Sequence, residues 1–121
     1  MEMLHAGVLG TGLPAEWQDH LRSVDFVALD GGRSVPDGID VVLVDGEHDT
    51  ALHDLRSLRP KLPHAQPIII TTPERRAFLQ RSVMLSPGLG EVWVVTPEQL
   101  RMPLLTRAAE IGTQRRRYCC P

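Results

Sequence analysis

Three short apolar runs of the sequence each end in polar residues that could act together on a phosphoryl group. These residues are Asp45, the pair Thr71–Thr72, and Thr96. An aspartate carboxylate can form a covalent acyl phosphate, and threonine hydroxyls can hydrogen bond to the phosphoryl oxygens. Because the carboxyl ends of parallel strands meet at one edge of a sheet, we expect the three sites to converge there. The sequence therefore predicts a phosphoacceptor-like pocket.

The pocket requires strands and helices that alternate along the chain. Apolar runs predict strands over 5–9, 25–29, 40–44, 67–71 and 91–95, and helices over 14–23, from 49 or 50 to 58, over 73–85 and from about 99 onward. Strands that are apolar throughout indicate a parallel sheet covered on both faces. Only about ten residues join the second and third strands, so the second helix is expected to be shortened or missing. Because Pro103 fits only a first helical turn, the last helix should begin near Gln99 or Leu100. Its apolar stripe is expected to be Leu100, Leu104, Ala108 and Ile111, which recur at near-helical spacing.

Composition limits the class of protein. With 121 residues the chain fits one α/β domain, which we place at residues 1–113, with 114–121 as a C-terminal tail or linker. The net charge of −2 gives no electrostatic footprint for direct nucleic-acid binding. No segment resembles a signal peptide or a membrane span, and the adjacent cysteines Cys119 and Cys120 suit no unstrained structural disulfide. We expect a cytoplasmic protein that contacts no membrane.

Three segments together resemble the receiver domain of two-component response regulators. The segment 39–45 is similar to the third receiver strand, and the segments 67–72 and 93–97 are similar to the fourth and fifth. The resemblance implies a doubly wound, flavodoxin-like sheet of five parallel strands. It makes Asp45 the phosphoacceptor-like residue and Thr72, Trp93 and Thr96 switch-like residues. It also implies a cis peptide bond before the switch-like Pro97.

The sequence departs from the receiver pattern where the chemistry would occur. Gly10 and Thr11 replace the acidic pair that would hold Mg²⁺, and Thr96 replaces the phosphate-binding lysine. Since phosphoryl transfer depends on positioning and charge neutralisation, we expect little or no autophosphorylation, no metal site, no cofactor and no enzymatic activity. Asp45 is then either a phosphosite or a structural anchor hydrogen-bonded to Thr11 or Thr72.

An atypical receiver implies a non-catalytic signalling module of a response regulator. We expect it to act without phosphorelay to Asp45, through dimerisation or ligand sensing, and to control a C-terminal output domain such as a transcription regulator. The resemblance implies a homodimer through the fourth helix, the fifth strand and the fifth helix. Candidate residues on that face are Arg76, Gln80, Arg101, Arg107 and Glu110.

The turn after the first strand indicates a second possible function. Gly10 and Gly12 belong to a G-x-G-x-x-A pattern, and Asp30 ends the second strand. Glycines at such a turn allow close approach of a pyrophosphate, and the acid can bind a ribose hydroxyl. This alternative is a small Rossmann-type nucleotide-binding or nucleotide-sensing domain.

Overall fold

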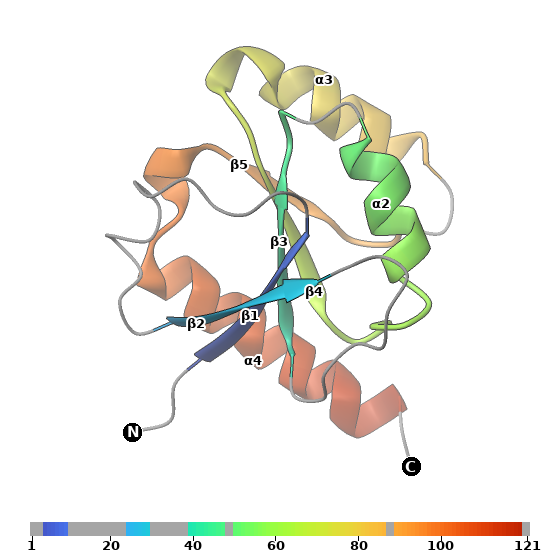
Figure 1. Cartoon of the computed structure of the whole chain (residues 1–121), viewed down its shortest axis with the longest axis vertical. Helices are drawn as coiled ribbons and strands as arrows, with labels where there is room; N and C mark the ends of the chain where they lie inside the picture. Colours follow the sequence, from blue (N-terminus) through green and yellow to red (C-terminus); the bar gives the residue numbers. More distant parts are fainter. Residues whose placement is uncertain (1–3, 10–23, 30–38, 48–49, 87–88, 120–121) are drawn as a thin grey trace.

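The computed structural model describes residues 4–9, 24–29, 39–47, 50–86 and 89–119, which form a five-stranded parallel sheet flanked by helices (Figure 1). The strands are β1 (Leu4–Leu9), β2 (Val24–Leu29), β3 (Val41–Asp45), β4 (Gln66–Ile70) and β5 (Trp93–Val95). The helical elements are α2 (Ala51–Leu58), α3 (Pro73–Met84), the 3-10 turn η1 (Pro97–Gln99) and α4 (Met102–Cys119). The strand order β2-β1-β3-β4-β5 is the flavodoxin-like order, so the predicted fold class is confirmed. The helix expected over 14–23 lies outside the described residues, as does the connection 30–38, where the second helix was expected to be shortened or missing.

Apolar residues of the central strands alternate between two cores, one on each face of the sheet. Val42, Val44 and Ile69 pack with buried residues of α2 and α3. Leu43 and Ile70 belong to the other core, where buried residues of α4 cover the sheet. Every residue of β4 is buried. Covering both faces is the reason why these strands read as unbroken apolar runs in the sequence.

Helix α4 confirms the position expected for Pro103 and shifts the expected apolar stripe. The helix begins at Met102, which leaves Pro103 in its first turn. Leu105 is fully buried, whereas Leu104, expected to face the core, is only partly buried. The helix continues to Cys119, so most of the expected tail is helical. No helix in the described ranges is both long and apolar enough to cross a membrane.

The junction after β5 differs from the receiver pattern in one respect. The peptide bond before Pro97 is trans, where the resemblance implied a cis bond. Pro97 opens the turn η1 rather than α4, and the backbone N–H of Thr96 donates to Oε1 of Gln99 at 3.0 Å. Thr96 and Pro97 thus start a separate turn between the sheet and the last helix.

Helix α4 rests on the start of β3 through Gly112. A Cβ atom at this position would lie 2.4 Å from the carbonyl oxygen of Asp40 and 2.9 Å from its Cβ. The next residue, Thr113, donates its hydroxyl to Oδ2 of Asp40 at 3.1 Å. A side chain at position 112 would therefore push the helix away from the strand.

We expect Gly112→Ala to destabilise the protein by about 1–3 kcal/mol, because the added methyl group overpacks a contact with backbone. In an unhindered helix the same change would stabilise by about 0.5–1 kcal/mol, so the sign itself is diagnostic. Urea denaturation measures the difference. The exposed Gln114 provides the control, since Gln114→Ala should stay within about 0.5 kcal/mol of wild type. A Gly112→Ala variant as stable as wild type would contradict the close packing.

Candidate functional site

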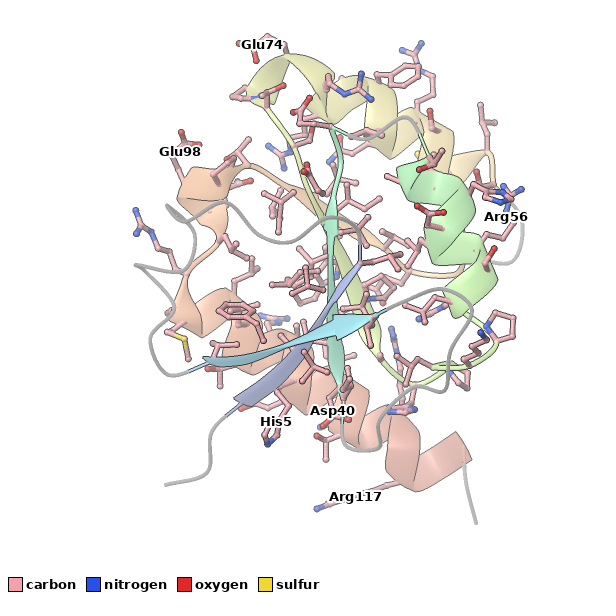
Figure 2. All side chains as sticks on the ribbon, in the orientation of Figure 1. His5, Asp40, Arg56, Glu74, Glu98 and Arg117 are labelled. Carbon is pink, nitrogen blue, oxygen red and sulfur yellow. The ribbon has the colours of Figure 1, made fainter. Side chains whose placement is uncertain are left out.

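The parallel register of β3 and β4 builds the carboxyl edge of the sheet around Asp45. Asp45 pairs with Ile70, so Thr71 and Thr72 follow directly beside it. The backbone N–H of Gly46 donates to the carbonyl oxygen of Ile70 at 2.8 Å and extends this pairing beyond the strand. Figure 2 shows Glu74 and Glu98 at this edge, whereas Asp40 lies at the opposite end of β3. The sequence correctly placed Asp45 and the threonine pair on neighbouring strand ends.

Gly46 is required for the close approach of the loop after β3. A Cβ atom there would lie 2.8 Å from Cγ2 of Ile69 and 2.9 Å from Cδ1 of Leu79. The residue is buried against the end of β4 and against α3. This contact turns the chain toward the start of α3 and sets the position of Glu47.

The carboxylate of Asp45 stabilises the same turn. Its Oδ1 accepts a hydrogen bond from the backbone N–H of Glu47 at 3.0 Å. Such an aspartate bond to the backbone two residues later is a common way to fix a loop. This contact fits the structural-anchor interpretation of Asp45, with a partner other than the Thr72 hydroxyl; Thr11 lies outside the described residues.

The carboxylate of Glu47 joins the loop after β3 to the junction of β4 and α3. Its Oε1 accepts from the backbone N–H of Thr72 at 2.9 Å and from the hydroxyl of Thr71 at 3.3 Å, and its Oε2 lies 3.6 Å from Nε of Arg75. The bond from the Thr72 N–H, opposed by partial burial and assisted by both threonine hydroxyls and Arg75, lowers the pKa of Glu47 below its ordinary value. The group is therefore charged at neutral pH.

Trp93 lies on β5 and Thr96 directly follows that strand, with β4 between them and Asp45. Thr96 is buried, and its neighbour in register is Thr71, whose N–H donates to the carbonyl oxygen of Val95 at 2.9 Å. Two strand spacings separate β3 from β5 by about 10 Å, which a threonine side chain does not span. Trp93 packs beside the α4 core and donates its Nε1–H to Glu91 at 3.2 Å. The switch-like residues Trp93 and Thr96 therefore do not reach the carboxylate of Asp45.

The donor set does not fit the Mg²⁺ ion that the receiver resemblance implies. A hard divalent cation takes several oxygen ligands, mostly carboxylates. The carboxylate of Glu47 is bound to two protein donors and faces a guanidinium, and Gly10 and Thr11 supply no carboxylate. Within the described ranges, no three His, Cys, Asp or Glu side chains gather as a metal site.

Glu47 is the site residue that sequence reasoning missed. It was recognised only as part of the Gly46–His48 segment that replaces the receiver loop. The available signal was an acid two residues after Asp45 together with donors at Thr71–Thr72 and a cation at Arg75. The residues of the nucleotide-binding alternative, Gly10, Gly12 and Asp30, lie outside the described residues, so that alternative stays a prediction.

Comparison with solved structures identifies similar folds. The REC domain of AraT, a response regulator from Geobacillus stearothermophilus, is 18% identical, with a TM-score of 0.60 over 93% of this chain and 98% of that chain. The adenylate cyclase from Rhodopirellula baltica is 13% identical, with a TM-score of 0.62 over 94% of this chain and 90% of that chain. No protein-family model and no curated protein matches the sequence. The chain has the receiver fold.

We expect Glu47→Gln to lower the free energy of unfolding by about 0.5–1 kcal/mol at neutral pH, the scale of a partly exposed charged contact. Gln keeps an acceptor for the Thr72 N–H but loses the attraction to Arg75. Because the pKa of Glu47 is lower in the folded state, its charge stabilises the protein above the unfolded pKa of about 4.3 and ceases to do so as the pH falls through the folded value. The difference should therefore shrink on acidification. Urea denaturation at several pH values measures it, and a constant difference would contradict this assignment.

Proposed function

We propose that this chain is a non-catalytic regulatory module with the receiver fold, of the kind found in response regulators, and that it works without phosphorylation of Asp45. The observation that carries the proposal is the position of Thr96. In the place of the phosphate-binding lysine that the resemblance implies stands an uncharged residue, two strands away from Asp45. A phosphoryl group on Asp45 would have no cation from β5 to neutralise it.

The contacts of Asp45 support the same proposal. Its carboxylate accepts the Glu47 N–H, and the Glu47 carboxylate takes up the donors of Thr71 and Thr72. Both contacts stabilise the loop in the unmodified protein. Asp45 then serves as a structural anchor of the edge rather than as a phosphorylation switch.

The exposed Met84 on α3 supports dimerisation as the way in which the module acts. Its side chain is 85% exposed, and it follows Arg76 and Gln80 at intervals of four residues, so the three share one side of the helix. Arg76 contacts Val94, which places this side next to β5. Methionine is enriched at protein–protein interfaces. The proposed face extends from α3 over β5 to α4 and would bring two copies, each with its attached output domain, together.

Contacts of the candidate face residues refine their roles. Arg76 is half-buried and donates its Nε–H to the carbonyl oxygen of Val94 at 3.3 Å, so it joins α3 to β5. Four of the five expected residues are exposed: Gln80, Arg101, Arg107 and Glu110. In the proposed dimer these four are available for contacts between subunits, while Arg76 holds the two elements of the face together.

We expect no phosphorylation when the protein is incubated with acetyl phosphate and Mg²⁺. Without a lysine from β5 and an acidic pair to hold the metal, the transferred group is neither positioned nor neutralised. Intact-mass spectrometry provides the measurement, with a phosphorylatable receiver domain treated in parallel as the control. A mass increase of one phosphoryl group that disappears in Asp45→Asn would contradict the proposal.

We expect Met84→Glu to weaken a homodimer at least about tenfold, because a buried charge replaces an apolar contact at the interface. Sedimentation equilibrium measures the dissociation constant. His53→Glu, which places the same charge on the exposed face of α2, should leave it unchanged. A wild-type protein that stays monomeric at all accessible concentrations would rule out dimerisation as the mode of action.

A further inference from the structure

We propose that Glu47 is a built-in anionic ligand of the junction between β4 and α3, which holds the start of α3 in its anion-bound arrangement without phosphorylation. This inference rests on the proposed function and adds the group that replaces the phosphoryl group. The anion is covalently part of the chain and therefore always present. It makes the arrangement of the edge constitutive rather than switched.

The loop after β3 is built to deliver this carboxylate to one place. Gly46 allows the backbone to close against Ile69 and Leu79, and its N–H is bonded to the carbonyl oxygen of Ile70. The Asp45 carboxylate then holds the N–H of Glu47. Two backbone contacts in sequence leave the Glu47 side chain directed at the junction of β4 and α3. The loop thus limits the entropy that the side chain loses on binding there.

The receiving group consists of three donors from two consecutive elements. A buried hydroxyl comes from Thr71, a backbone N–H from Thr72, and a guanidinium from Arg75 in the first turn of α3. Nε of Arg75 is buried and forms no hydrogen bond in the described structure other than its ion pair with Glu47. Donors of these three kinds, with a helix start behind them, are the usual partners of an anion.

Glu47 is distinguished from the other acids nearby by its contacts. Glu74 lies in the first turn of α3 and is exposed. Its charge is therefore attracted to the positive end of the helix dipole, which requires no specific hydrogen bond. Asp45 lies on the β3 side, where its carboxylate holds the loop. Arg75 is the charged group that acts on the Glu47 carboxylate. Glu74 stands in the same turn of α3 as Arg75 and therefore provides a matched control.

Nuclear magnetic resonance of the full chain tests the proposal at the Thr72 amide. We expect the Thr72 amide proton to move with pH, with a midpoint below the ordinary value for glutamate, because it is bonded to the titrating carboxylate. Glu47→Gln should abolish this movement. Glu47→Ala should also speed exchange of the Thr72 amide with solvent by about threefold to tenfold, the factor for one lost hydrogen bond.

Glu74→Gln provides the control and should leave the titration of the Thr72 amide in place. An amide that does not titrate in wild type, or one that still titrates in Glu47→Gln, would overturn the inference about Glu47. Treatment of the same samples with acetyl phosphate and Mg²⁺ tests the proposed function separately. Labelling of wild type at Asp45 would overturn that function, whatever the Thr72 amide reports.

Discussion

The parallel register between β3 and β4 is the constraint on which the rest of the carboxyl edge depends. Because Asp45 stands opposite Ile70, the residues that follow each strand emerge side by side. The hydrogen bond from Gly46 to Ile70 continues the ladder by one residue. A slip by one position would exchange the two faces of β3 and place its core residues on the wrong sides. The apolar cores on both faces therefore fix the edge as firmly as they fix the sheet.

The carboxyl edge of the sheet carries donors that could bind a phosphoryl group, but these donors contact a carboxylate of the protein instead. Threonine hydroxyls, a backbone N–H and an arginine from the start of α3 all meet the carboxylate of Glu47. The threonine donors thereby have an acceptor in the unmodified protein, and Arg75 has a counter-charge. Since a polar group deprived of its partner costs free energy, displacement of Glu47 would need another anion to replace it.

The similarity to the REC domain of AraT gives the fold of this chain, whereas the types of the site residues decide its chemistry. A TM-score of 0.60 with 18% identity shows a shared fold. The chemistry of a site depends on particular side chains, which a fold does not guarantee. Here the residue at the position of the receiver lysine is Thr96, and the residue that meets the junction of β4 and α3 is Glu47. The regulatory role is therefore proposed from these side chains and their contacts.

The sequence by itself determined the order of the described strands and helices, the burial of the sheet on both faces and the convergence of Asp45 with Thr71 and Thr72. These features follow from local periodicity and from the rule that parallel strands end at one edge. Other features depended on contacts between distant segments. Whether Leu104 or Leu105 faces the sheet depends on where α4 settles, and the helical continuation past residue 113 accompanies the contact of Arg115 with Glu91 at 3.0 Å.

Only the tertiary structure determined which side chain contacts the junction between β4 and α3, namely Glu47. Glu47 and Thr72 are 25 residues apart, and no local pattern relates them. Their contact requires the sheet register, the close approach at Gly46 and the turn held by Asp45, all at once. Sequence reasoning could identify which groups were present at the edge. Only the folded chain determined which carboxylate would reach the threonines, because that depends on the direction of a loop and not on residue type.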